Sequence, residues 1–157
     1  MNLEYLSIYN NLIKLTRNKS LYLNLIDKET FSDRIIFLLL HLSFLIRAYK
    51  DQNAKNLMQD IHDFIFRQIE LSIREIGFGD VSINKNMKKY VNFFYDILSK
   101  MDKWDNYKFD RKCEILNNFI NNPKNISFYA DYFDKLSTFY KNNTLNYFTK
   151  DIEDLKI

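Results

Sequence analysis

The chain of 157 residues has the length of one domain and is long enough to bury one substantial core. Two glycines and one proline are too few for an all-β fold, which needs many tight turns. The net charge of +3 permits an anionic partner without implying one, and the lone Cys113 excludes an internal disulfide and suits a reducing compartment.

Helical spacing of apolar residues predicts a first helix over residues 3–16 and a short helical turn over residues 21–25. Thr30 and Asp33 then stand at capping-box spacing ahead of an apolar run. We expect a helix over residues 32–49 that is apolar almost all round and therefore lies at the centre of the fold. Its apolar run is shorter than the roughly 20 residues that cross a bilayer, so a buried core helix is expected.

The next helix is predicted over residues 54–76. Its expected buried face consists of Leu57, Ile61, Phe64, Ile65, Ile69, Ser72 and Ile76. On another face, Glu70 and Arg74 form an i,i+4 pair with the acid first, the favourable order, as do Asp63 and Arg67. This face is either solvated or a polar docking face.

Both glycines of the chain lie in the corner that follows this helix. Gly77 is predicted to end the helix in the left-handed conformation. Asp80 or Ser82 is then expected to cap the next helix, predicted over residues 84–101.

Further helices are predicted over residues 108–121 and 125–141, separated by Pro123, with a last turn within residues 145–157. No segment has the pattern of a strand, a repeat or a flexible linker. The sequence thus predicts an all-α fold, a compact single-domain bundle of about six to eight helices over residues 1–157.

The chain lacks the residue patterns of common catalytic and metal sites. Two histidines and one cysteine cannot form a standard zinc site, and the Glu-x-x-His pairs of di-iron bundles are absent. No phosphate-binding glycine loop or catalytic triad is recognisable. We therefore expect no enzyme activity, metal, cofactor or small-molecule substrate.

Arg34, Leu38 and His41 share one face of the expected central helix. His41 is either a core histidine that hydrogen-bonds a buried polar neighbour or a polar point in a binding cleft. Both interpretations remain open from the sequence.

Lys85, Lys88 and Lys89 form a basic cluster just after the glycine corner. Because Lys85 lies near the expected start of a helix, its charge opposes the helix dipole, which marks it as a functional candidate. A solvated basic face is the alternative. RNA or an anionic lipid surface could use such a patch.

The segment from Arg74 to Lys85, followed by Phe94-Tyr95, resembles the signature of the ubiquinol–cytochrome c chaperone family. Thr30 and Arg34 before Leu39-Leu40-His41-Leu42 add to the resemblance, which covers most of the chain and is most specific over residues 30–95. Asp33 and Asn84 replace family glycines, and Asp96-Ile97 replaces a Gly-Arg pair, as in a divergent bacterial-type member.

The resemblance implies a non-enzymatic assembly factor that binds newly made cytochrome b, or another subunit of the respiratory bc1 complex. It implies work near the ribosome or the inner membrane, with a small co-chaperone as a further partner. No signal or transit peptide is recognisable, so we expect a cytoplasmic protein, with peripheral contact at the inner membrane left open. The candidate partner-binding residues are Arg34, His41, Arg74, Glu75, Asp80, Lys85, Lys88 and Lys89. The alternative is a basic helical module that binds RNA or an anionic membrane without a cytochrome b client.

Overall fold

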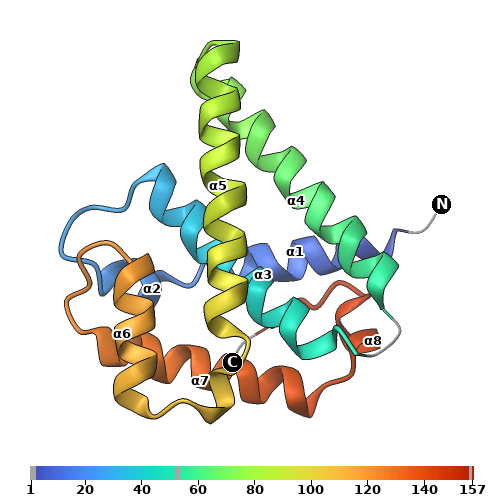
Figure 1. Ribbon diagram of the computed structural model, residues 1–157. Coiled ribbons are helices and arrows are strands. Elements are labelled where there is room, and N and C mark those ends of the chain that lie inside the picture. Colours follow the sequence, from blue (N-terminus) through green and yellow to red (C-terminus); the bar gives the residue numbers. More distant parts are fainter. Residues whose placement is uncertain (1–2, 52–53, 156) are drawn as a thin grey trace.

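The computed structural model describes residues 3–51, 54–155 and 157, and in this part of the chain it contains helices and no strands (Figure 1). The α-helices are α1 (Glu4–Thr16), α2 (Lys19–Leu23), α3 (Phe31–Tyr49), α4 (Lys55–Ile76), α5 (Asp80–Met101), α6 (Phe109–Phe119), α7 (Ile126–Asn142) and α8 (Leu145–Phe148). A short 3-10 helix, η1 (Trp104–Asn106), connects α5 to α6. The predicted all-α class is confirmed.

Helix α3 begins at the predicted capping box. The Asp33 amide donates to Thr30 Oγ1 at 3.2 Å, and the Thr30 amide donates back to Asp33 Oδ2 at 2.9 Å. Both bonds satisfy amides that a helix start leaves without partners. The side chains from Ile35 to Leu45 are all buried, as expected for a central helix.

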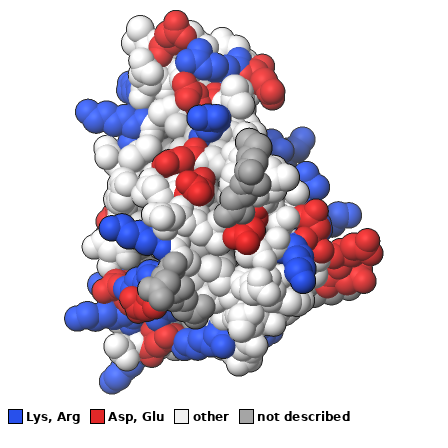
Figure 2. Space-filling view, turned by 90° about the vertical axis from the view of Figure 1, so that its right-hand side faces the viewer, with Lys and Arg blue, Asp and Glu red and all other residues white. Residues whose placement is uncertain are grey.

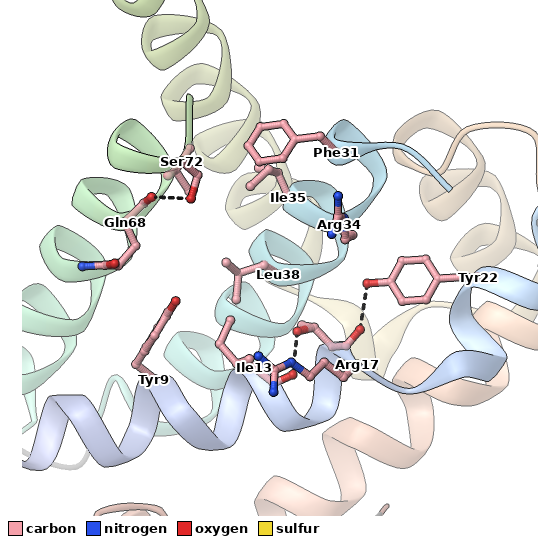
Figure 3. A pocket seen from close by; sticks show the side chains of 12 residues that line it. Tyr9, Ile13, Arg17, Tyr22, Phe31, Arg34, Ile35, Leu38, Gln68 and Ser72 are labelled. Carbon is pink, nitrogen blue, oxygen red and sulfur yellow. Dashed lines mark hydrogen bonds between the residues drawn. The ribbon is translucent and has the colours of Figure 1, made fainter. Parts of the chain in front are cut away.

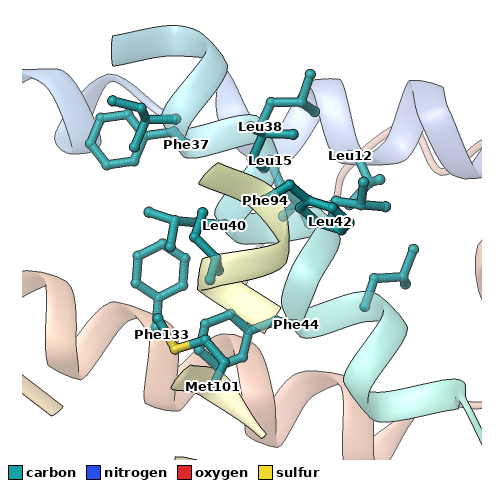
Figure 4. Packing of buried hydrophobic residues seen from close by; sticks show 14 of the residues in the cluster. Leu12, Leu15, Phe37, Leu38, Leu40, Leu42, Phe44, Phe94, Met101 and Phe133 are labelled. Atoms are coloured by element: carbon teal, nitrogen blue, oxygen red, sulfur yellow. The ribbon is translucent and has the colours of Figure 1, made fainter. Parts of the chain in front are cut away.

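Helices α1, α4, α5 and α7 all pack against α3. Aliphatic and aromatic side chains from these elements meet in one core (Figure 4). Phe44 of α3 stacks on Phe133 of α7 with ring centroids 5.1 Å apart, and it meets Trp104 edge-on at 5.2 Å. The Trp104 indole N–H donates to Asp134 at 2.8 Å, which lets this large side chain be buried.

Helices α4 and α5 form a hairpin whose closed end projects from the rest of the molecule (Figure 1). Gly77 ends α4 with φ of 101°, the predicted left-handed conformation. Gly79, with φ of −74° and ψ of 164°, is the N-cap of α5, and no side chain caps this helix. The predictions that α5 begins near residue 84 and that Asp80 or Ser82 caps it were therefore wrong, because the helix starts directly after Gly79.

The end of this hairpin lies outside the core. Ile73 of α4 and Ile83 of α5 are the buried side chains nearest the corner, and Ile76 beyond them is exposed. The prediction that Ile76 continues the buried face was wrong, because by this point α4 has passed the body of the protein.

The segment after α8 fastens the C-terminal part of the chain to α1. The Asn11 side-chain amide donates to the carbonyls of Phe148 at 3.1 Å and Lys150 at 2.9 Å. The Ile152 amide donates to Asn11 Oδ1 at 3.1 Å. One buried asparagine thus satisfies three backbone groups of a segment that has little regular structure of its own.

Candidate functional site

A pocket of about 320 Å³ lies between α1, α3 and α4, at the base of the projecting hairpin (Figure 3). Its middle is apolar and is formed by Ile13 of α1 with Ile35 and Leu38 of α3. Polar side chains line both of its ends. The pocket therefore has the form of a short apolar slot between two polar rims.

Two arginines, Arg17 and Arg34, line the rim nearest α2. Arg17 follows the last residue of α1, and Arg34 stands in the first turn of α3. Both residues are exposed, and neither guanidinium makes a hydrogen bond or ion pair with any other described residue. This rim thus presents two cations whose donor groups are available to a ligand.

Tyr22 completes the arginine rim and is fixed in place. Its hydroxyl donates to the Thr16 carbonyl at 2.7 Å. Burial, with a smaller contribution from the Glu29 charge, raises the pKa of Tyr22 to about 12. The phenol is therefore neutral at physiological pH and acts as a wall of the pocket rather than as a charged group.

The opposite rim consists of Tyr9, Gln68 and Ser72. The Ser72 hydroxyl donates to the Gln68 backbone carbonyl at 2.9 Å, and both residues line the pocket. Tyr9 packs edge-on against Phe64 at 5.0 Å, and burial raises the pKa of its phenol. This rim is polar and uncharged.

The hairpin end carries three of the predicted residues, Arg74, Glu75 and Asp80, all of them exposed. The Arg74 guanidinium pairs with Glu70 and with Asp80, each at 3.1 Å, and so joins α4 to the first residue of α5. The predicted Glu70–Arg74 pair is present. Asp63, by contrast, accepts from Gln59 at 2.8 Å and from His62 at 3.0 Å rather than from Arg67.

Apolar side chains surround these charges at the hairpin end. Leu71 is 46% exposed, Ile76 53%, Phe78 46% and Val81 85%. Figure 2 shows acidic and basic side chains interspersed at the projecting end of the molecule. We call this set of four apolar residues the hairpin tip.

Lys85, Lys88 and Lys89 are exposed on α5, below the hairpin tip. Among the described residues none of them pairs with a carboxylate, and the Lys89 ammonium lies 5.6 Å from the centre of the Tyr90 ring. Because α5 begins at Asp80, Lys85 lies beyond the first turn, where the helix dipole has little effect. The argument that the Lys85 charge opposes the dipole was therefore wrong.

His41 is fully buried in the core and does not line the pocket. Its Nδ1 lies 2.6 Å from the Phe37 carbonyl, and its Nε2 lies 2.5 Å from the Tyr132 hydroxyl. Burial lowers the pKa of His41 to about 4, so the ring is neutral, with Nδ1 donating and Nε2 accepting. Of the two interpretations left open by the sequence, the structure supports the core histidine.

The predicted site residues thus fall in separate places: Arg34 at the pocket, His41 in the core and the others along the hairpin. Sequence reasoning missed Arg17, Tyr9, Tyr22 and Gln68. Tyr9 and Ile13 belong to the helix predicted over residues 3–16, and Arg17 follows directly after it. The available signal was that Tyr9, Ile13 and Arg17 share one helical face.

Two further observations concern the residues described by the structure. None of their helices combines the length and the apolar character needed to cross a bilayer. Nor do their His, Cys, Asp and Glu side chains gather into a group of three that could hold a metal ion.

The family model of the ubiquinol-cytochrome C chaperones matches residues 25–122 of this chain. The chain belongs to the ubiquinol–cytochrome c chaperone family. The matched range contains the whole of α3, the projecting hairpin and α6. No curated protein and no solved structure matches the chain. The family relationship therefore rests on the part of the chain that carries the hairpin tip and Arg34, while Arg17 lies before it.

Proposed function

We propose that this ubiquinol–cytochrome c chaperone family member is a non-enzymatic assembly factor. Its client is newly made cytochrome b of the respiratory bc1 complex, which it binds in the cytoplasm, near the ribosome or at the inner membrane. Family membership supports a chaperone role, and the client, its location and the bacterial setting are the parts that we propose.

The observation that carries this proposal is the hairpin tip. Folded proteins that act alone seldom gather exposed large apolar side chains at one projecting end, whereas protein-binding surfaces do so commonly. Phe78 and Val81 stand on either side of Gly79 in the corner between α4 and α5, the closed end of the hairpin that projects from the body. A client made of apolar helices needs such contacts before it is inserted into a membrane.

The charges at the tip also suit a protein client better than a nucleic acid. Arg74 is already paired with Glu70 and Asp80, so its charge is balanced locally. Close to the tip, the basic cluster that RNA or an anionic membrane could use is Lys85, Lys88 and Lys89 on α5. Binding through these lysines would weaken steeply as salt rises, whereas binding through the tip would change little.

The test is recovery of cytochrome b with a tagged chain from detergent-treated cells. Replacing Ile76, Phe78 and Val81 together by serine should remove most of the recovered cytochrome b. The matched control replaces Leu23 and Ile26, which are 70% and 65% exposed but lie away from the hairpin, by serine. Because all five side chains are largely exposed, both variants should melt like the unmodified chain.

The proposal is supported if only the tip variant loses cytochrome b and if the unmodified chain binds cytochrome b equally well at low and high salt. Equal loss with both variants would show nonspecific apolar binding. Recovery of RNA in place of cytochrome b, removed by high salt, would favour the basic helical module instead.

A further inference from the structure

We propose that the pocket between α1, α3 and α4 binds an acidic side chain that belongs to an apolar segment of the client. The two arginines would hold the carboxylate, and the apolar slot would take a neighbouring side chain. This inference rests on the proposed function, because it assumes a polypeptide client.

The arginine rim of the pocket carries positive charge that no described carboxylate balances. Arg17 and Arg34 come from different helices and share one rim, and neither contacts a carboxylate among the described residues. Arg34 also stands in the first turn of α3, where the helix dipole disfavours a cation. Two cations at one rim make that rim attractive to an anion.

The carboxylate nearest to Arg34 in the sequence, that of Asp33, already has hydrogen-bond partners. Asp33 accepts from the Thr30 amide at 2.9 Å and from the Thr30 hydroxyl at 3.0 Å through one oxygen. Its other oxygen lies 3.5 Å from the Asn121 side-chain amide. Glu29, whose charge helps to raise the pKa of Tyr22, is exposed and makes no ion pair with either arginine. An external carboxylate would therefore find the guanidinium donors available.

The size and the lining of the pocket indicate the class of ligand. The volume of about 320 Å³ is at the lower end of ligand pockets, which range over roughly 300–1,000 Å³, so it suits a short segment rather than a whole helix. Guanidinium groups bind carboxylates through paired hydrogen bonds. Ile13, Ile35 and Leu38 beside them offer an apolar floor, which selects an acidic residue next to an apolar one.

The experiment measures binding of two fluorescein-labelled peptides to the purified chain by anisotropy. One peptide contains the sequence Leu-Phe-Leu-Asp-Asp and the other contains Leu-Phe-Leu-Asn-Asn. The acidic peptide should bind at least tenfold more tightly, and Arg17→Gln or Arg34→Gln should each weaken it about tenfold. Arg34→Lys keeps the charge but cannot form paired hydrogen bonds with a carboxylate. Its affinity for the acidic peptide should lie between those of the unmodified chain and of Arg34→Gln.

The matched control is Arg67→Gln, which removes the same charge from an exposed position on α4 outside the pocket. It should bind the acidic peptide like the unmodified chain. Equal affinity for the two peptides, or an equal loss with Arg67→Gln, would overturn the proposal. So would binding of decanoate, but not of the acidic peptide, in a manner that depends on Arg17 and Arg34, because that outcome would assign the pocket to a fatty anion.

Failure of this inference can be told apart from failure of the proposed function. If the Arg17→Gln, Arg34→Gln double variant recovers cytochrome b as well as the unmodified chain, the chaperone function stands and the pocket proposal falls. If no cytochrome b is recovered at all but acidic peptides still need both arginines, the pocket stands and the client is a different protein.

Discussion

Helix α3 and the hairpin tip differ in how far their side chains are buried. Along α3 every side chain from Ile35 to Leu45 is buried, including polar His41 and Ser43. At the hairpin tip, four large apolar side chains are between 46% and 85% exposed within a short span around two glycines. The first region is dominated by burial and packing, and the second bears apolar surface that the fold itself does not cover.

From this difference we infer a division of roles: the region around α3 stabilises the fold, and the hairpin tip binds a partner. Removing atoms from the α3 region leaves cavities that the close-packed neighbours cannot fill. Removing atoms from the hairpin tip leaves no cavity. The same kind of substitution there should change the free energy of unfolding little but weaken binding of a partner strongly. The predictions below test this division, beginning with the largest expected effect.

The sharpest contrast is between two phenylalanines. Phe44→Ala should lower the free energy of unfolding by about 3–5 kcal/mol, because it removes the ring that packs on both Phe133 and Trp104. Phe78→Ala, at a side chain 46% exposed, should change it by about 0.5 kcal/mol or less. Urea denaturation followed by circular dichroism measures both. Similar losses for the two variants would contradict the division.

The core should also respond to pH through His41. Burial lowers the pKa of this ring from 6.5 to about 4, so the unfolded chain binds the proton more tightly than the folded chain. Stability is therefore full above pH 6.5 and falls as pH drops toward 4, by about 2 kcal/mol between pH 7 and pH 5. Denaturation at several pH values should show this slope, and His41→Gln should remove it.

Two carboxyl groups titrate outside this window and do not obscure the test. The hydrogen bond from His62 lowers the pKa of Asp63. At Asp105, burial acts in the opposite direction, but the hydrogen bonds from Lys141 and Arg47 prevail and lower the pKa. An unchanged slope in the histidine variant would therefore show that His41 does not govern stability over this range.

The two glycines at the hairpin end should behave differently from each other. Gly77→Val should cost about 1 kcal/mol or more, because φ of 101° strains a β-branched residue, and Gly77→Asn should cost less. No atom outside the local chain lies within 4 Å of an added Cβ at either glycine, so the effect is conformational. Gly79→Ser keeps an allowed backbone and adds an N-cap acceptor, so it should be neutral or slightly stabilising. Thermal melting separates these cases, and equal melting of all three variants would rule out a backbone role for Gly77.

The smallest effect on folding is expected from the lysines. Lys85→Glu, alone or with Lys88→Glu and Lys89→Glu, should change stability by about 0.5 kcal/mol or less, since all three lie beyond the first turn of α5 and are exposed. If they help to hold the client, the triple variant should recover less cytochrome b at an unchanged melting temperature. Full recovery of cytochrome b would show that the lysines do not contribute to binding and would leave the hairpin tip as the binding surface.

Much of the fold could be predicted because its signals are local. Thr30 and Asp33 stand three residues apart before an apolar run, and both bonds of the capping box form. Gly77 ends an apolar pattern and takes the left-handed conformation that such a position favours. The start of α5 was missed because its N-cap is Gly79, which has no side-chain acceptor, so no capping side chain marks the boundary.

The candidate site was less predictable because it depends on contacts between distant segments. Arg34 could be selected from the sequence, but its partner at the rim, Arg17, comes from the end of another helix. The sequence grouped His41 with Arg34 and Leu38 on one helix face, but His41 does not line their pocket. Its ring contacts Tyr132, which is 91 residues away in the chain. The exposure of Ile76 depends on where α4 leaves the body, which helical periodicity alone does not encode.

The most direct test of the central claim is site-specific photocrosslinking in cells. A benzophenone amino acid placed at Phe78, on the hairpin tip, is compared with the same group at Tyr147, an aromatic residue of similar exposure on α8 (46% and 42%). The account predicts that irradiation joins cytochrome b to the chain from position 78 and not from position 147. Crosslinks to cytochrome b from position 147 alone, or from neither position while cytochrome b still copurifies with the chain, would contradict it.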